Sequence, residues 1–428
     1  MNMREDFESR LEALVNAPVA FADGSENVAR VAAWAELDEE IDEQEILLEL
    51  RKAKERLDNN PELFSGDPDG VYTYEDPILA LAAFLDQANA NLSSMIGVAG
   101  AEGRELRNAA FWNWVRTGVR AWLTSGDRSY NLLAGRTPRA PINPKKENIR
   151  FAVVGDAGYR GLAQQNVIQD IRERHRAFPF DFIIHLGDVY FAGSGQEMLT
   201  NFLGPYMDIG PPVLTLLGNH DRYFGAEAYA EALKVLKQPG RYFVIENTHW
   251  RIACLDTALA AERLLRNEGL LDPGQLSWLD ELVADEKPLI LMSHHFVVSG
   301  WGTISNGLKQ QLSKRLKNVF AWYWGHEHSC ATYDKKDVGF YGACVGNGAF
   351  LEVWREPSRS PIPTWHAMGR CNCYDGRAKF WPHGYLELEL HPEKIIENYH
   401  LEVGETHSRI LEFKNQPGAT VTVPPDPL

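Results

Sequence analysis

Short apolar and β-branched runs recur through the middle of the chain, and each ends at a glycine or a polar residue. These runs are residues 150–154, 181–186, 212–217, 288–292 and 319–324. Runs of this length that are bounded by turn residues are typical of buried strands. Between them, residues 163–173 and 273–283 have the apolar spacing of amphipathic helices. The alternation predicts a layered α/β domain, in which ligands gather at the carboxyl ends of the strands.

Two further strand pairs are expected to extend this domain. Residues 241–246 and 250–255 lie on either side of Asn247-Thr248, which favours a hairpin or two adjacent strands. Leucine alternates with glutamate over residues 386–390, the period of a half-buried strand, and residues 395–401 are expected to return beside it. We therefore expect the α/β domain to cover residues 149–415 and a flexible, Pro-rich tail to cover residues 416–428.

The first 135 residues differ in character and are predicted to form a separate helical region. Acidic residues strongly outnumber basic ones near the start, and residues 38–57 fit a solvated amphipathic helix. Further helices are expected at residues 76–90 and 105–123. The second has an aromatic face, which we expect to pack against the α/β domain rather than on a membrane. Three prolines predict an extended linker at residues 136–148.

Composition and charge limit the classes of function. The chain has 428 residues, of which 44% are apolar and 24% are charged, as in an ordinary soluble protein with enough material for two domains. Its formal charge of -16, from 43 basic and 59 acidic residues, argues against binding long nucleic acid through a basic face. A small phosphorylated substrate remains compatible with that charge.

The sequence predicts a cytoplasmic protein without a membrane span. The acidic first residues lack the apolar core of a signal peptide, and no window approaches the roughly 18 to 20 apolar residues of a spanning helix. The five cysteines have no paired C-x-x-C spacing, so neither a disulfide framework nor a zinc knuckle is expected. No protein partner of the N-terminal region can be identified from the sequence.

Five short blocks stand at the ends of the five predicted strands and carry the candidate chemistry. In chain order they are Gly155-Asp156-Ala157-Gly158, Gly187-Asp188, Gly218-Asn219-His220-Asp221, Ser293-His294-His295 and Gly325-His326-Glu327-His328. An aspartate that follows a strand and a glycine is fixed by a rigid element, while the backbone stays open to a ligand. One such Gly-Asp pair is usually an ordinary turn. The whole series of carboxylates, amide and imidazoles instead suits two closely spaced divalent or trivalent cations.

With these blocks, the chain resembles the calcineurin-like metallophosphoesterase superfamily over residues 149–350, and the motif style is closest to the purple acid phosphatase branch. Residues 269–279 are also similar to the tract that precedes the fourth block in many members. The resemblance implies a four-layer αββα sandwich and two metal ions of the Mn, Fe or Zn class. It implies one ligand set of Asp156, Asp188 and His328 and a second of Asp188, Asn219, His294 and His326, bridged by Asp188.

Two positions depart from the family pattern. Many members have a histidine two residues after the first aspartate, where this chain has Gly158, as the purple acid phosphatase branch does. That branch has a tyrosine three residues after the second aspartate, where this chain has Phe191, and Tyr190 stands one position earlier. Tyr190 is either a ligand of the first metal, which would favour a ferric ion, or part of the pocket wall. In the fourth block, the resemblance makes His294 the ligand and leaves His295 behind it or facing the substrate.

Together these features predict a dinuclear metal-dependent hydrolase of phosphate esters. A hydroxide that bridges the metals would attack phosphorus, and His220 would protonate the leaving oxygen. Asp221 is a candidate for orienting His220, and Arg160 or Arg222 for binding phosphate. Two alternatives stay open: a phosphodiesterase that acts on cyclic or small nucleotides, and a non-catalytic scaffold that retains the fold.

Overall fold

The computed structural model describes the part of the chain that was predicted to be α/β. The described residues are 146–158, 161–189, 193, 195–222, 226–260, 269–284, 287–301, 304–350, 354, 356–368, 381–402, 404 and 406–413. The predictions for residues 1–135, for most of the 136–148 linker and for the 416–428 tail lie outside them. Arg160, Tyr190 and Phe191 also lie outside the described residues, so the extra ligand at Tyr190 stays a prediction.

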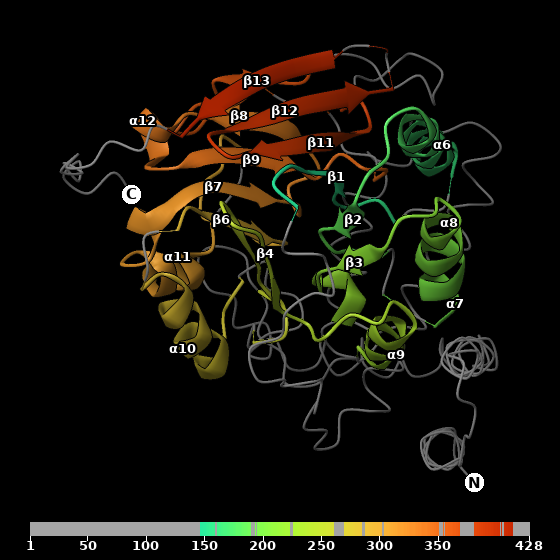
Figure 1. Cartoon of the computed structure of the whole chain (residues 1–428), viewed down its shortest axis with the longest axis horizontal. Coiled ribbons are helices and arrows are strands. Elements are labelled where there is room, and N and C mark those ends of the chain that lie inside the picture. The colour runs from blue at the N-terminus through green and yellow to red at the C-terminus, as the bar shows by residue number, and fades with distance from the viewer. Residues whose placement is uncertain are drawn as a thin grey trace, which may run out of the picture.

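Two β-sheets form the centre of the structure (Figure 1). The first sheet contains β1 (Ile149–Val154), β2 (Phe182–His185), β3 (Val213–Thr215), β11 (Gly384–His391), β12 (Lys394–Leu401) and β13 (Thr406–Glu412), in the order β13-β12-β11-β1-β2-β3. The second contains β4 (Phe243–Glu246), β5 (Arg251–Cys254), β6 (Leu289–Ser293), β7 (Val319–Trp324), β8 (Cys330–Tyr333), β9 (Tyr341–Val345) and β10 (Trp365–His366), in the order β10-β8-β9-β7-β6-β5-β4.

Strand pairing confirms the strands and hairpins that the sequence predicts. β1, β2 and β3 are parallel neighbours, as are β5, β6, β7 and β9 in the second sheet. The pairs β4–β5 and β11–β12 are antiparallel, as expected from their spacing. Because each parallel group directs its carboxyl ends to one edge of its sheet, the residues after those strands share that edge.

Helices cover the outer faces of both sheets (Figure 1). Beside the first sheet lie α6 (Leu162–Ala177), α7 (Gly195–Glu197), the π-helix η2 (Met198–Leu203), α8 (Gly204–Met207) and α9 (Glu227–Val235), and beside the second lie α10 (Pro273–Leu282) and α11 (Asn306–Leu312). The remaining short helices are η3 (His220–Arg222), η4 (Leu316–Asn318) and α12 (Lys335–Val338). None of the described helices combines the length and the hydropathy that crossing a membrane requires.

The alternation of side chains along β1 explains why the sheets form two inner layers. Phe151 and Val153 point into the apolar core between the sheets, whereas Ala152 and Val154 point into a second core that includes residues of α6 and α9. A strand that is apolar on both faces is buried on both faces. The order helices, sheet, sheet, helices is the predicted αββα fold, and it brings the carboxyl edges of both sheets to one side.

Candidate metal centre

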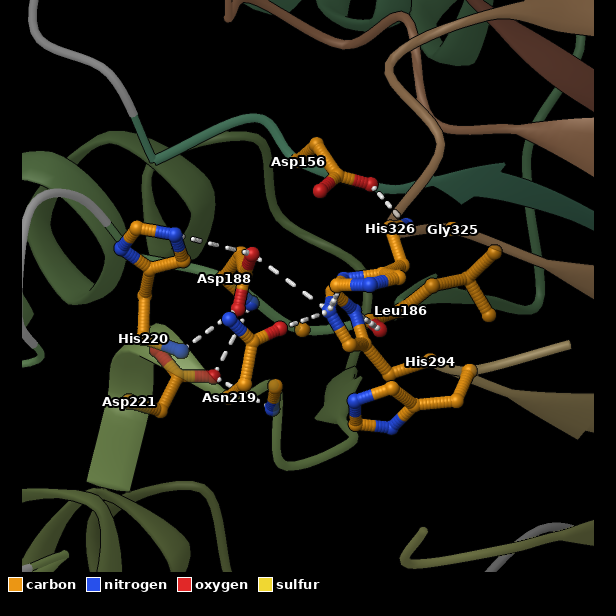
Figure 2. A network of polar contacts seen from close by, with 12 residues as sticks. Asp156, Leu186, Asp188, Asn219, His220, Asp221, His294, Gly325 and His326 are labelled. Atoms are coloured by element: carbon orange, nitrogen blue, oxygen red, sulfur yellow. Dashed lines mark hydrogen bonds and ion pairs between the residues drawn. The ribbon is translucent and has the colours of Figure 1, made fainter. Parts of the chain in front are cut away.

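The candidate ligands lie where the carboxyl ends of the two sheets meet. Asp156, Asp188 and Asn219 follow β1, β2 and β3 of the first sheet, and the histidines of the last two blocks follow β6 and β7 of the second. Figure 2 shows the side chains of Asp188, Asn219 and His294 pointing toward one another. The candidate ligands form two groups, and within each group the potential ligand atoms lie within 4.8 Å of one another. The first group is Asp156, Asp188 and His328. The second is His294, His295 and His326.

The first group connects the two sheets through Asp156. Oδ1 of its carboxylate lies 3.4 Å from Nε2 of His328. Oδ2 accepts a hydrogen bond of 2.7 Å from the backbone N–H of His326 (Figure 2). The ring of His328 lies against Phe350, with 4.3 Å between the ring centroids. The first and fifth blocks therefore form one side of the site.

The second group is centred on His294. Its Nδ1 lies 3.0 Å from the backbone carbonyl oxygen of Leu186, so Nδ1 carries a proton and donates it. Its other nitrogen, Nε2, lies 2.9 Å from Oδ1 of Asn219 and 3.1 Å from Nδ1 of His326. Oδ2 of Asp188 lies 3.4 Å from the same Nε2 (Figure 2). Side chains of the second, third and fifth blocks thus converge on one atom of the fourth block.

This convergence requires a positive charge. The lone pair of His294 Nε2 would face the oxygens of Asp188 and Asn219, and such an arrangement is repulsive unless a cation lies between the atoms. Burial alone would lower the pKa of His294, but the nearby carboxylates, Asp188 first, outweigh burial and raise it to about 9. In the metal-free protein a proton therefore supplies the charge. A metal ion bound by the same nitrogen and oxygen atoms would supply it equally well, so the donor set fits the implied metal.

Three of these residues adopt backbone conformations that are unusual outside glycine. The φ angles are +56° for Asp156, +69° for Asp188 and +66° for His326. Left-handed conformations are uncommon for residues with a side chain, and they cluster at functional sites where the surroundings enforce them. The turns after β1, β2 and β7 therefore hold Asp156, Asp188 and His326 in unfavourable backbone conformations, and these conformations place the residues at the site.

Two glycines of the blocks leave the room that the site needs. A Cβ atom on Gly218 would lie 2.0 Å from Oδ1 of Asp188, so any side chain there would displace that carboxylate. A Cβ atom on Gly158 would lie 2.4 Å from Cα of Val189. The position at which many family members have a histidine is therefore packed against backbone in this chain and has no room for one.

His220 lies at the edge of the site. Its Nε2 is 4.0 Å from Oδ2 of Asp188, and its side chain is 17% exposed. Its backbone N–H donates a hydrogen bond of 3.0 Å to Oδ1 of Asp188. The ring therefore has access to solvent and to the centre of the site.

Asp221 is buried below the site and contacts backbone. Its carboxylate accepts hydrogen bonds from the N–H groups of Asp188 at 2.9 Å, Val189 at 2.7 Å and Gly218 at 2.8 Å. Burial and the charge of Asp188 raise the pKa of Asp221 to about 7, although the three N–H groups act against this rise. These contacts fasten the turn that carries Asp188 to the third block.

The sequence did not single out several residues that support the blocks. Glu327, between the two histidines of the fifth block, accepts a hydrogen bond from the hydroxyl of Ser299 and thereby connects the loops after β6 and β7. Thr257 contacts His295, with 2.9 Å between Oγ1 and Nδ1. Thr257 follows β5 as the candidate ligands follow their own strands, and this position was the signal that could have identified it.

Comparisons with known proteins agree with the family indicated by the blocks. Residues 149–330 match the family model "Calcineurin-like phosphoesterase", a span that contains all five blocks but fewer than half of the 428 residues. A search of curated proteins gave no match.

Two solved structures illustrate the similarity of fold. One is GAP50, described as the anchor in the inner membrane complex of Plasmodium, with 14% identity over 64% of this chain and 91% of that chain and a TM-score of 0.48. Another is a dimetal phosphatase from Danio rerio, with 14% identity over 62% of this chain and 99% of that chain and a TM-score of 0.44. At these values, neither likeness carries an argument about activity.

The family match and the architecture lead to the same conclusion. The match begins at the first residue of β1 and ends at the first residue of β8. Within it lie β1 to β7 and every candidate ligand. The chain therefore carries a calcineurin-like phosphoesterase domain, the domain of a phosphoesterase hydrolase.

Proposed function

We propose that this site binds two metal ions of the Mn, Fe or Zn class and hydrolyses phosphate esters. The proposed ligands of one ion are Asp156, Asp188 and His328, and those of the other are Asp188, Asn219, His294 and His326. The convergence of oxygen atoms of Asp188 and Asn219 on Nε2 of His294 is the main support, because a cation balances it. The motif style of the purple acid phosphatase branch, with Gly158 after the first aspartate, is part of the same proposal.

When bound, the ions would supply positive charge that attracts the phosphoryl group and lowers the pKa of a coordinated water. The chain itself orients the groups around them. Asp188 lies between the two ligand groups, and its Oδ1 is fixed by the backbone N–H of His220. Asp221 holds the same turn through three backbone N–H groups. We therefore propose that Asp221 positions the turn that carries Asp188, in place of orienting His220.

His220 is the proposed general acid. An imidazole can give a proton near neutral pH, and the ring of His220 stands at the rim of the site with access to solvent that would return the proton. The proton would pass from the ring to the leaving oxygen of the ester.

A small phosphorylated molecule is the proposed substrate, and the net charge of -16 disfavours long nucleic acid. Hydrolysis of monoesters is the first choice, with cyclic or small nucleotide diesters as the alternative. A non-catalytic scaffold gains no support from the site, because every proposed ligand position carries a side chain that can bind metal.

Metal analysis combined with a substrate panel tests the proposal. The purified protein, reconstituted with manganese, iron or zinc, should bind two ions per chain and hydrolyse an aryl phosphate, an aryl diester or a cyclic nucleotide. Asp188→Asn should abolish metal-dependent turnover while the circular dichroism spectrum stays that of the wild type. Absence of both metal binding and hydrolysis in the wild-type protein would contradict the proposal.

A further inference from the structure

A third histidine, which is itself buried, lies beside the two histidines of the second proposed ligand set. The ring centroid of His295 is 4.7 Å from that of His326 and 4.9 Å from that of His294. His295 is only 1% exposed. The proposed ligand sets and the proposed acid leave this imidazole without a function.

Thr257 fixes the protonation of His295. The hydroxyl oxygen of Thr257 accepts the backbone N–H of His295 at 3.1 Å and lies 2.9 Å from Nδ1 of the same residue. The arrangement that satisfies the hydroxyl of Thr257 has it donate to Nδ1 of His295. In a neutral imidazole one nitrogen accepts and the other carries the proton. In that arrangement, the proton of a neutral His295 sits on Nε2.

This Nε2–H group is a hydrogen-bond donor without an acceptor among the described residues. Within the described part of the chain, Nε2 of His295 is buried and has no hydrogen-bond partner. An unsatisfied buried donor is unfavourable, so most buried donors are paired in native proteins. A donor that is kept unpaired beside a ligand site suits an acceptor that arrives with the ligand.

The surroundings of His295 are built to hold it in place. A Cβ atom on Gly269 would lie 2.6 Å from Cβ of His295, so this position admits no side chain. The next residue, Leu270, donates its backbone N–H to the carbonyl oxygen of Thr257 at 2.9 Å. Gly269 and Leu270, at the start of the tract at residues 269–279, thus pack against the Thr257–His295 pair.

The turn that carries Thr257 is fixed from its other side. The side-chain amide of Gln275 makes two hydrogen bonds of 2.8 Å with the backbone of Asp256. Arg241 forms ion pairs with the carboxylates of both Asp256 and Asp272. Three segments therefore cooperate to present one threonine hydroxyl to one imidazole, which is more than a passive core residue needs.

We propose that His295 is a substrate-binding residue, whose Nε2–H donates a hydrogen bond to a phosphoryl oxygen bound at the second metal position, and that Thr257 is its positioning residue. The inference rests on the proposed function. In this proposal His295 is not a metal ligand. A metal ligand would need a free lone pair on Nε2, whereas the contact with Thr257 favours the tautomer in which Nε2 carries the proton. A hydrogen bond to a charged oxygen contributes roughly tenfold to hundredfold in affinity.

The test measures inorganic phosphate binding by calorimetry on the metal-loaded, full-length protein. His295→Ala should weaken phosphate binding at least about tenfold while the metal content per chain is unchanged. His295→Gln, whose amide can place an N–H near the same point, should restore part of the affinity. Thr257→Val removes the hydroxyl and should weaken phosphate binding, whereas the control Thr257→Ser retains the hydroxyl and should bind as the wild type does.

Cobalt-loaded protein distinguishes a donor from a ligand, because loss of a ligand changes the visible absorption of the ion. An unchanged spectrum in His295→Ala, together with weaker phosphate binding, is the expected result. A changed spectrum or a lost ion would overturn the inference by making His295 a ligand, and unchanged phosphate affinity would overturn it by making His295 a core residue. Failure of the wild-type protein to bind metal would refute the proposed function as well, so the two failures are distinguishable.

Discussion

At the scale of single residues, the site depends on a few side chains that contact backbone rather than ligand. Asp221 is the clearest example, because its carboxylate satisfies three N–H groups in the turn that carries Asp188. A buried carboxylate that accepts several hydrogen bonds is costly to replace, since its partners stay buried without an acceptor. From the sequence, Asp221 could be placed beside His220, but this set of contacts could not be predicted.

Asp221→Asn is expected to destabilise the protein by about 2–4 kcal/mol and to weaken metal binding. The asparagine amide has an NH₂ group in place of one carboxylate oxygen, so at least one of the three backbone N–H groups would face a donor instead of an acceptor. Urea unfolding and metal titration measure the two effects. The exposed Asp208 provides the control, since Asp208→Asn should change the unfolding free energy by less than about 0.5 kcal/mol. Wild-type stability and metal affinity in Asp221→Asn would contradict the positioning role.

His220→Ala is expected to slow the hydrolysis of substrates with poor leaving groups much more than that of substrates with good ones, because only a poor leaving group needs a proton. Rates for an alkyl phosphate and for a nitrophenyl phosphate measure the difference. Equal losses for the two substrates would argue against the acid role.

At the scale of elements, an ion-pair cluster joins α6 to β1, β11 and β12. The buried carboxylate of Glu387 pairs with Arg150 of β1 and Arg174 of α6, and with His400 of β12 at 3.0 Å. Burial alone would raise the pKa of Glu387, but the hydrogen bonds from His400, Arg174 and Arg150 together lower it to about 2. The cluster therefore connects a helix to the strand that leads into the first block.

The pKa of Glu387 is lower in the folded protein than in the unfolded chain. Glu387 therefore stabilises the folded protein at pH values above the pKa that its carboxyl has in the unfolded chain. This contribution is lost as the pH falls from about 4.5 toward about 2. Glu387→Gln should lower the free energy of unfolding by about 1–3 kcal/mol at pH 7 and should flatten its fall across that acidic window. Denaturant unfolding between pH 2 and pH 7 measures both effects.

Glu389, two residues along the same strand and about a third exposed, is the matched control. Glu389→Gln should leave the acid profile nearly as in the wild type, because exposed ion pairs contribute little. If Glu387→Gln retained the wild-type slope below pH 4.5, the cluster would not be the source of the acid sensitivity.

The particular elements show what the sequence could and could not predict. The apolar runs, the two antiparallel pairs and α10 were predictable, because each has a local pattern and α10 also has Asp272 as its N-cap. The six proposed ligands could be predicted because they follow the carboxyl ends of strands. Thr257 and the contact of Glu327 were not predicted, because these contacts join loops after neighbouring strands of the second sheet. The loops meet only once those strands have paired, and such contacts leave no period or spacing in the chain.

At the scale of the whole molecule, the candidate centre lies across the interface between the sheets. Asp156, Asp188 and Asn219 come from the first sheet, and the histidines come from the second. A second buried network spans the same interface, where Glu397 of β12 accepts hydrogen bonds from Tyr323 of β7 at 2.7 Å and from Arg409 of β13. Any ion bound at the centre therefore connects the two halves of the core.

Removal of metal should lower the melting temperature of the whole domain, because an ion that binds only the folded protein stabilises it in proportion to the logarithm of its concentration. At a free Mn²⁺ concentration of 100 times Kd, the gain is about 2.7 kcal/mol. Differential scanning calorimetry with a chelator and with graded Mn²⁺ measures the shift. Asp188→Asn should melt at nearly the same temperature with and without Mn²⁺, and a metal-independent melting temperature in the wild type would contradict a site between the sheets.

The left-handed turns at Asp156, Asp188 and His326 also bear on how this site would change over evolution. Glycine accepts such a turn without cost, whereas asparagine and aspartate accept it only more readily than most other residues. A lineage that no longer needed the metals would gain stability by replacing these three residues, and glycine should be the common substitute. Descendants that keep two aspartates and a histidine there would be those in which selection on the chemistry continues.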